Sequence, residues 1–179
     1  MPEVQIRSVV ATDLPILMAI DHACKTDYVW QMDLQPQEDQ VSVAFREMRL
    51  PRSVTVEYSR PVSSLADEWS RKVGMLVAIL DKQQVGYTRI TDRVVPRTAW
   101  ITDLVVAPRF RKMGIGTALI MSAQNWALER KNLRIFLEMS SKQHPAISLA
   151  QKIGYEFCGY NDHYYANQDI TLFFGRTLR

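Results

Sequence analysis

The chain has 179 residues, of which 47% are hydrophobic and 23% are charged, and its formal net charge at pH 7 is +3. These shares are typical of a globular protein and exclude a disordered, collagen-like or coiled-coil chain. The length predicts a single domain over residues 1–179. The modest positive charge lacks the clustered basic face of a nucleic-acid binder, so we expect a small phosphorylated ligand and no nucleic-acid partner.

The apolar and metal-ligating residues limit the location and the cofactors of the protein. The longest apolar run, Met75 to Leu80, is far shorter than the roughly 20 residues that span a bilayer. The first residues do not resemble a signal peptide, so we expect a cytoplasmic protein with no membrane partner. The two cysteines and three histidines lack the spacing of a metal site or disulfide framework, so no metal is predicted.

The N-terminal third predicts a strand, a helix and a segment that is difficult to classify. Alternating apolar and polar residues over 4–9 predict a half-buried strand, and helical spacing from Leu14 predicts a helix that ends near residue 24 or 25. Over 26–61 we expect an aromatic loop followed by extended segments. A short helix should then begin at residue 63 or 64 and end at 71.

The second half alternates strand patterns with helix patterns. Residues 75–80 and 85–90 are rich in β-branched residues and predict a hairpin with a four-residue loop, and 99–106 predicts a third strand. We expect a helix over 115–131 and a strand over 133–139. The remaining expected elements are a short helix over 145–152 and two closing strands over 155–160 and 169–174. This order predicts an α/β or α+β fold around a mixed sheet.

The loop between the strand over 99–106 and the next helix carries the most specific motif. It reads Arg111, Lys112, Met113, Gly114, Ile115, Gly116, Thr117. The first N–H groups of a helix lack internal acceptors and the helix dipole is positive there, so a pyrophosphate can bind against them. The glycines allow close approach to the backbone, and Arg111 and Lys112 add positive charge, with Arg109 as a third candidate.

Two other phosphate-binding motifs fail on this loop. A Rossmann fingerprint needs another glycine where Leu119 stands, and a P-loop needs Gly-Lys-Ser/Thr where residues 116–118 read Gly-Thr-Ala. An ordinary glycine turn with solvated basic residues is the remaining alternative.

The spacing of Arg111, Gly114 and Gly116 after a strand resembles the Arg/Gln-x-x-Gly-x-Gly/Ala signature of the GNAT superfamily of acetyl-CoA-dependent N-acetyltransferases. A second family block is similar to residues 143–155. Four positions of that block match, Ala146, Ile147, Leu149 and Gly154, while Gln143 replaces the usual asparagine and Ala150 the usual tyrosine. Within the superfamily, the motifs are most similar to the streptothricin acetyltransferases and the ribosomal-protein alanine N-acetyltransferases.

The resemblance implies a fold and a division of the chain. The expected fold is a mixed, mostly antiparallel twisted sheet of about six to seven strands, flanked by helices and splayed at the two central strands. Residues 73–176 would form the acetyl-CoA core and 1–72 the acceptor side. At the splay, the backbone of Leu104, Val105 and Val106 would pair with pantetheine, and the Leu104 N–H would stabilise the thioester oxyanion. Residues 111–117 would hold the pyrophosphate, and Gln143 stands where the family commonly contacts the pantetheine arm.

Two acidic residues interrupt apolar strand patterns and are candidates for the base. An ammonium must lose a proton before its nitrogen can attack, so transfer needs a base. Asp103 and Glu138 both lie in such strands, where an unpaired charge is costly. Glu138 also matches the glutamate that acts as base in the ribosomal alanine acetyltransferases. A salt bridge to Arg134 or Arg89 is the structural alternative.

Further candidate residues concern the leaving group and the acceptor. The family tyrosine that often protonates the CoA thiolate is absent at Ala150, and Tyr164 or Tyr165 could replace it, although adjacent tyrosines are also common packing residues. Aromatic faces and carboxylates together suit an organic cation, which makes the segment 28–33 an acceptor candidate. Its candidate residues are Tyr28, Trp30 and Asp33. The alternative is that Tyr28 and Trp30 close the core.

The sequence therefore predicts an N-acetyltransferase that moves an acetyl group directly from acetyl-CoA to a primary amine of a small molecule or peptide, without metal. Cys158 lies too far from any motif to support a ping-pong nucleophile. The alternatives are a non-catalytic acyl-CoA-binding or sensing domain, favoured by Ala150, and a nucleotide-binding interaction module. We expect a monomer or a homodimer.

Overall fold

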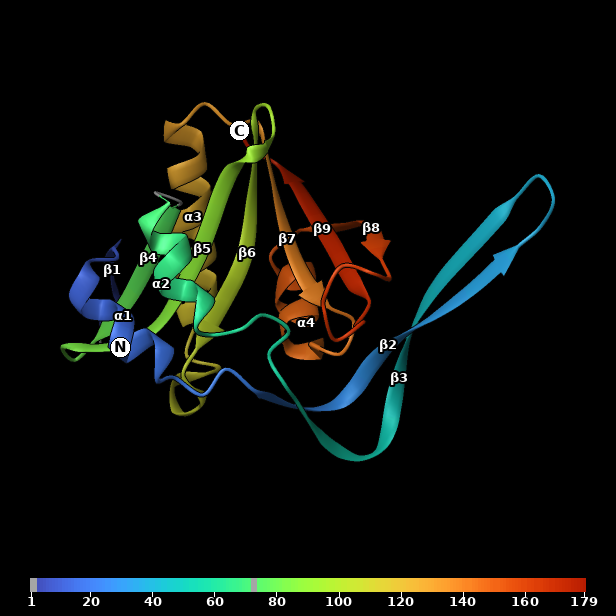
Figure 1. Cartoon of the computed structure of the whole chain (residues 1–179), viewed down its shortest axis with the longest axis horizontal. Coiled ribbons are helices and arrows are strands. Elements are labelled where there is room, and N and C mark those ends of the chain that lie inside the picture. Colours follow the sequence, from blue (N-terminus) through green and yellow to red (C-terminus); the bar gives the residue numbers. More distant parts are fainter. Residues whose placement is uncertain (1–2, 72–73) are drawn as a thin grey trace.

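The computed structural model describes residues 3–71 and 74–179, so the first two residues and the predicted core boundary at 73 lie outside the described residues. The main sheet has seven strands in the order β1-β4-β5-β6-β7-β9-β8, and of its described pairs only β6 and β7 are parallel (Figure 1). The strands are β1 (Gln5–Ser8), β4 (Gly74–Leu80), β5 (Gln83–Val95), β6 (Thr98–Val106), β7 (Arg134–Ser140), β8 (Glu156–Asn161) and β9 (Thr171–Thr177). The predicted mixed, mostly antiparallel sheet is confirmed.

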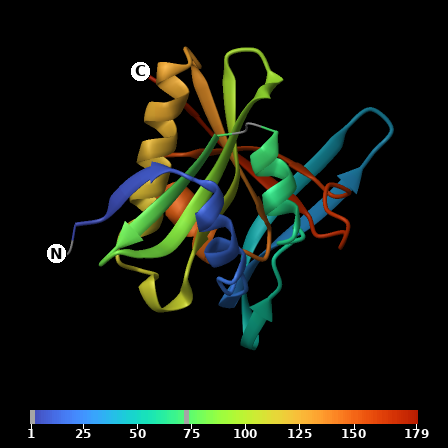
Figure 2. The same cartoon turned by 60° about the vertical axis from the view of Figure 1, so that its left-hand side comes forward.

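Helices cover both faces of this sheet (Figures 1 and 2). The helices α3 (Ile115–Glu129) and α4 (His144–Lys152) pack on one face, and α1 (Leu14–Met18) and α2 (Ser64–Ser70) pack on the other. Short 3₁₀ turns, Ala11–Asp13 and Pro108–Phe110, precede α1 and α3. Strand β4 is buried on both faces, which explains its continuous apolar sequence. None of the helices in the described ranges is long and apolar enough to cross a bilayer.

The two central strands separate partway along their length. Strands β6 and β7 pair from Thr98 with Arg134 to Ile101 with Leu137, and the ladder ends there. Thr102 is an extra residue relative to β5, because Ile101 pairs with Ile90 while Asp103 pairs with Arg89. A bulge of this kind bends a strand. The predicted splay is therefore present, and it opens after Ile101.

The segment after α1 differs most from the prediction. The helix ends at Met18 rather than at residue 24 or 25, because the buried His22 ring contacts the Ile20 carbonyl and the Tyr87 hydroxyl and holds the chain in a turn. The expected aromatic loop is wrong, since those residues form strand β2 (Cys24–Pro36). The extended segments after it are confirmed as strand β3 (Val41–Val56). The two strands pair with each other and form a long arm that projects from the body (Figures 1 and 2).

The hairpin between β4 and β5 is tighter than predicted. Its loop has two residues, Asp81 and Lys82, rather than four, and both have positive φ angles of 47° and 64°. Two positive φ values in succession match the twist of a two-residue hairpin turn. The other helices and strands that the sequence predicts from residue 63 onward are present within a few residues of their expected ends.

Candidate active site

A small cleft of about 50 Å³, partly open to solvent, lies where β6 and β7 separate. The connection between β3 and α2 covers one side of it, and the N-terminus of α4 borders another. The lining residues are Tyr58, Ser59, Arg60, Ile101, Thr102, Asp103, Leu104, Leu137, Glu138, Met139, Gln143, Ala146 and Tyr165. Both predicted acidic residues thus face one cavity, one from each of the two separated strands.

The Glu138 carboxylate on β7 is buried, with only 1% of its side chain exposed. Its Oε1 pairs with the Arg60 guanidinium, and its Oε2 accepts a 2.8 Å hydrogen bond from the Tyr164 hydroxyl. Burial raises the pKa of Glu138 above its ordinary value, while Arg60 and Tyr164 oppose part of that rise. Such a carboxylate is a better proton acceptor than an exposed glutamate. The predicted salt-bridge partners of Glu138, Arg134 and Arg89, are not its partners here.

The Asp103 carboxylate on β6 is also buried, with 3% of its side chain exposed. Its Oδ2 lies 2.6 Å from the Arg89 Nε, and Thr102 donates a 3.0 Å hydrogen bond to the same oxygen. The Tyr58 hydroxyl donates to Oδ1. The structural alternative of an Asp103–Arg89 salt bridge is confirmed. Every partner of Asp103 belongs to the protein's own packed interior, which leaves little room for a substrate proton.

Next to Asp103, three polar side chains contact one another in succession: Tyr58, His22 and Tyr87. The Tyr58 ring centroid lies 5.0 Å from that of His22, and the His22 Nε2 is 3.0 Å from the Tyr87 hydroxyl. Burial lowers the pKa of His22 and raises that of Tyr87. These groups are therefore uncharged near neutral pH, and they support Asp103 without adding a second charge.

The adjacent tyrosines, Tyr164 and Tyr165, lie in the connection between β8 and β9 and take different positions. Tyr164 is 42% exposed and contacts Glu138 through its hydroxyl, whereas Tyr165 is buried and lines the cleft. The Arg60 guanidinium carbon lies 5.8 Å and 5.7 Å from their two ring centroids, within cation–π range. Burial and the nearby Glu138 raise the pKa of Tyr165, so its hydroxyl keeps its proton.

Contrary to the expectation from the sequence, the side chain of Arg111 does not point toward the N-terminus of α3. Its guanidinium donates to three backbone carbonyl oxygens, those of Val106 at 2.8 Å, Ala23 at 2.9 Å and Asp21 at 3.3 Å. In this structure its donors tie the loop to the chain just before β2, and the role of Arg111 toward a pyrophosphate stays a prediction. Arg109 likewise bonds Gln83 at 2.6 Å.

The backbone of the same loop has the predicted form. Gly114 is the N-cap of α3 with φ +83°, a conformation that favours glycine. The N–H groups of Ile115, Gly116 and Thr117 occupy the first turn, where a helix provides no acceptors. A Cβ on Gly116 would lie 3.1 Å from Leu149, so this glycine also lets α3 approach α4. Lys112 and Met113 are exposed beside this turn.

The positions expected along the pantetheine arm border the separated strands. Leu104 lines the cleft and Val105 points into the apolar core, while the Val106 carbonyl is already occupied by Arg111. Gln143 also lines the cleft, but its Oε1 accepts the Ser140 N–H at 3.0 Å, which fixes the start of α4. Ala150, where the family tyrosine is missing, is fully buried in the core.

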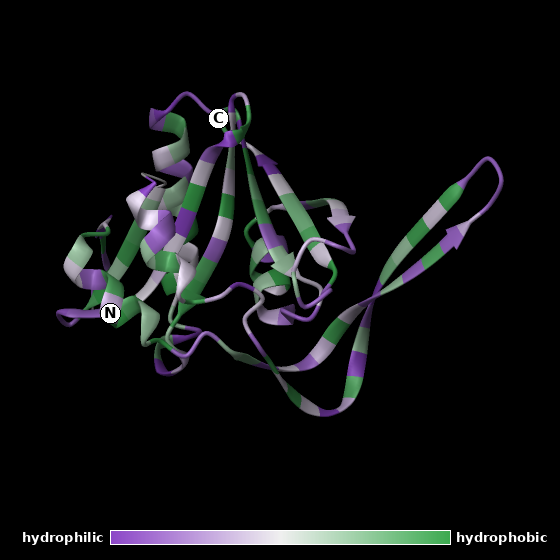
Figure 3. Ribbon diagram, in the orientation of Figure 1, coloured by the Kyte–Doolittle hydropathy of each residue, from purple (hydrophilic) through white to green (hydrophobic). Residues whose placement is uncertain are grey.

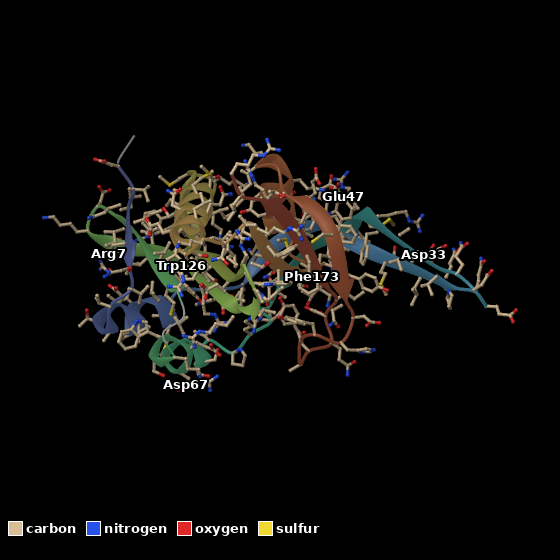
Figure 4. The ribbon with its side chains drawn as sticks, turned by 90° about the horizontal axis from the view of Figure 1, so that it is seen from above. Arg7, Asp33, Glu47, Asp67, Trp126 and Phe173 are labelled. Atoms are coloured by element: carbon tan, nitrogen blue, oxygen red, sulfur yellow. The ribbon has the colours of Figure 1, made fainter. Side chains whose placement is uncertain are left out.

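The three predicted acceptor residues do not line the cleft. The Tyr28 ring stacks on His144 with centroids 5.1 Å apart, and Trp30 packs against the main apolar cluster. Asp33 lies farther out on the projecting arm (Figure 4). The packing alternative thus describes Tyr28 and Trp30 in this structure, and their role toward an acceptor stays a prediction.

The sequence analysis missed two cleft residues, Tyr58 and Arg60. Arg60 pairs with a glutamate 78 positions away, and Tyr58 bonds an aspartate 45 positions away. Both lie in an irregular connection with no periodic pattern. The nearby Pro61 signals a turn but gives no indication of what the neighbouring side chains contact.

The chain is similar in sequence to known acetyltransferases. A Streptomyces lavendulae streptothricin acetyltransferase is 31% identical over 85 residues, which cover 48% of this chain and 45% of that protein. A Bacillus subtilis protein assigned as a ribosomal-protein bS18 alanine N-acetyltransferase is 28% identical over 135 residues, which cover 69% of this chain and 87% of the relative. The chain thus spans less than half of the Streptomyces relative.

A solved structure extends the comparison to the whole fold. The structure of a Bacillus anthracis protein assigned as a streptothricin acetyltransferase, in complex with acetyl coenzyme A, has a TM-score of 0.80 and 20% identity, and the match covers 99% of each chain. The sequence profile of the acetyltransferase (GNAT) family matches residues 42–155. That range contains most of this chain, including the basic loop, α4 and every residue that lines the cleft except Tyr165. The chain therefore belongs to the acetyltransferase (GNAT) family.

Proposed function

We propose that the protein is an acetyl-CoA-dependent N-acetyltransferase that acts by direct transfer to a primary amine. The observation that carries this proposal is the position of Glu138, a buried carboxylate with a raised pKa that faces the opening between β6 and β7. In this reading, the chain from β4 onward binds the donor, and the segments before it border the acceptor.

The donor would enter between the separated strands. The first-turn N–H groups of α3, at Ile115, Gly116 and Thr117, face outward where a pyrophosphate can accept them. From there the pantetheine arm extends along Leu104 toward Ile101, where the strands rejoin. This route brings the thioester between the two strands, beside Glu138. Acetyl coenzyme A bound to the Bacillus anthracis neighbour supports this choice of donor.

The acceptor arrives as an ammonium and must lose a proton. Glu138 takes that proton, directly or through a water, and the freed nitrogen lone pair attacks the acetyl carbonyl carbon. The oxyanion that forms accepts a hydrogen bond from a backbone N–H of the open strand edge at Leu104. Collapse breaks the carbon–sulfur bond and expels the thiolate, which takes a proton from Tyr165. The proton held by Glu138 then passes to the Tyr165 phenolate, directly or through a water, so that both side chains regain their starting state. The second nitrogen proton leaves to solvent, so the products are an acetamide and CoA thiol.

The surroundings of Arg60 indicate that the acceptor is a cation. In the protein without substrate, this guanidinium pairs with Glu138 and lies near the faces of Tyr164 and Tyr165. An ammonium needs the same surroundings, an anion and aromatic faces. We infer that the acceptor cation takes the place of Arg60, whose side chain is 27% exposed and can move outward. The names of the relatives support amines of both kinds, those of a small molecule such as streptothricin and those of a peptide.

The proposal is tested by measuring CoA release from acetyl-CoA with a panel of amines. The panel contains small polyamines, amino-acid amides and short peptides with a free α-amine. Release above the background of hydrolysis with at least one cationic amine, and its loss in Glu138→Gln, is the expected result. Tight acetyl-CoA binding with no amine-dependent release would favour the second candidate function, an acyl-CoA-binding domain, which Ala150 motivates.

A further inference from the structure

The projecting part of the arm has one apolar face and one polar face. Residues directly opposite each other in a two-stranded sheet share a face, and so do residues two apart along a strand. Hydrophobic and hydrophilic residues alternate along the arm (Figure 3), and the register of β2 and β3 places the apolar ones on one side of it. The apolar face consists of the pairs Met32–Phe45, Leu34–Val43 and Pro36–Val41, and the polar face of Gln31–Arg46, Asp33–Ala44 and Gln35–Ser42.

This apolar face is open to water toward the tip. Leu34, Val43 and Val41 are 42%, 37% and 64% exposed. An isolated two-stranded hairpin is marginally stable in water, and it needs a further surface against its hydrophobic face. An antiparallel sheet with one apolar face and one polar face typically packs its apolar face against another protein surface. The arm therefore has the chemistry of an interface.

The apolar face continues onto the body of the same chain. The Phe45 ring lies 5.4 Å from both the Phe157 ring and the Tyr160 ring of β8, the edge strand of the main sheet. Phe157 is itself 48% exposed. The arm and the edge strand thus form one apolar corner, with Phe45 at the bend.

Opposite charges lie at the two ends of this corner. The tip of the arm, residues 37–40, contains Glu38 and Asp39 and no basic residue. Beyond Phe157, a shallow cleft is lined by Arg134, Arg176 and Arg179, with Glu156 as its one acidic side chain. An acidic tip and a basic cleft on one molecule cannot meet within it, because the arm points away from the body (Figure 1).

We propose that the arm is a dimerisation element that binds a second copy of this chain about a two-fold axis. The two arms pack antiparallel through their apolar faces, with the axis near the Leu34–Val43 pair. The six steps along the chain from Phe45 to Asp39 span at most about 20 Å at the rise of a strand. Each acidic tip then reaches the Phe45–Phe157 corner of the partner copy, next to its basic cleft.

A second copy of the chain provides a matching surface both for the apolar face of the arm and for its acidic tip. A two-fold interface is self-complementary, so a patch on one copy must find its match on the same chain. Here the apolar arm face matches itself, and the acidic tip matches the basic cleft. Charge complementarity of this kind fixes the register and raises the association rate more than the affinity. The apolar pairs are therefore the part that holds the dimer together.

The test is the mass of the protein in solution, measured by sedimentation equilibrium over a concentration series. The intact chain should show twice the 20.6 kDa chain mass at high concentration. Leu34→Lys with Val43→Lys should give the monomer mass. Gln35→Lys with Ser42→Lys is the matched control, because it adds the same charge at the neighbouring pair on the opposite face. This control should remain dimeric, and circular dichroism checks that both variants fold.

A charge exchange tests the register. Glu38→Arg with Asp39→Arg should weaken the dimer by at least about tenfold in dissociation constant, and adding Arg176→Glu with Arg179→Glu should restore much of the affinity. A monomer at every concentration would overturn the proposal. If the dimers of both double-lysine variants dissociate equally, the apolar face does not have the proposed role. If the charge exchange does not restore affinity, the antiparallel register is wrong.

Discussion

The two sides of the cleft each present a buried carboxylate paired with an arginine, but the pairs are built differently. On β6, Asp103 is held by Arg89, which is only 5% exposed and lies on the neighbouring strand. On β7, Glu138 is held by Arg60, which is 27% exposed and lies in an irregular connection. The first pair is part of the sheet, whereas the second can open without disturbing any strand.

This difference separates a structural carboxylate from a reactive one. Removing one partner of a buried ion pair leaves an uncompensated charge and is strongly destabilising. Such a pair stabilises the fold only while neither member changes its protonation state. A base must change its protonation state in every cycle, so the pair that opens to the cleft is the suitable one. This difference supports the proposal that Glu138 acts as the base while Asp103 stabilises the fold, and the following experiments test that proposal.

The largest effect is expected for Glu138→Gln in the presence of an acceptor amine. Loss of a general base lowers turnover on the order of 10³-fold at neutral pH, with partial recovery at alkaline pH, where more of the amine is already deprotonated. Acetyl-CoA affinity should change little, as measured by calorimetry. Full activity of Glu138→Gln across the pH range, together with an inactive but folded Asp103→Asn, would exchange the two roles.

The second effect concerns stability. Asp103→Asn removes the nearer anion of Arg89 and leaves it with Glu68 at 3.6 Å, so it should lower the free energy of unfolding by about 3 kcal/mol. Glu138→Gln should lower it by less, because Arg60 can turn toward solvent. Urea unfolding followed by circular dichroism measures both. Equal losses in the two variants would mean that Arg60 is as fixed as Arg89.

The third prediction tests the acetyl-CoA site independently of Asp103 and Glu138. Gly114→Asn and Gly114→Asp share the same size, and both residues tolerate the left-handed conformation that φ +83° requires. They differ in one negative charge beside the first turn of α3. Gly114→Asp should therefore bind acetyl-CoA roughly tenfold more weakly than Gly114→Asn, as repulsion from a phosphate at a helix N-terminus predicts. Identical affinities would remove the pyrophosphate from this turn.

The smallest effect is a shift in the pH profile. Because burial raises the pKa of Glu138, the ascending limb of kcat/KM should lie above the ordinary glutamate pKa of about 4.3. The Tyr164 hydroxyl stabilises the ionised carboxylate, so Tyr164→Phe should move the limb to higher pH by roughly half a unit. Tyr165→Phe serves as the comparison, with a lower kcat and an unmoved limb. A shift to lower pH in Tyr164→Phe would contradict the assignment.

Patterns within short segments predicted much of the fold and part of the site. The two-sided burial of β4 appears as a continuous apolar run, and the strand–loop–helix motif marks the start of α3. The splay and the placement of both acids came from the family resemblance and from charges that interrupt apolar strands. These features depend on neighbours in sequence or on a motif, so a single sequence contains them.

Contacts between distant segments account for what the sequence did not predict. The end of α1 depends on His22 reaching Tyr87, 65 positions away, and the cleft depends on Arg60 reaching Glu138. Strand β2 was not predicted because it pairs only with β3 and because the apolar residues toward the tip of the arm are exposed, whereas a half-buried strand is recognised by one face that packs on a core. The two-residue turn at Asp81 and Lys82 lacks the glycine or asparagine that marks such turns.

The side chain of Arg111 joins the two halves of the molecule at a single point. Its N–H groups bond the carbonyl of Val106, which is near Arg111 in the chain. They also bond the carbonyls of residues 21 and 23, which lie about 90 positions before Arg111 and just before the arm begins. The family signature accepts glutamine at this position, but a glutamine side chain has only two N–H donors on one nitrogen. A relative with glutamine here must therefore anchor the first residues of its acceptor side by another route, and the two segments will vary together when such chains are compared.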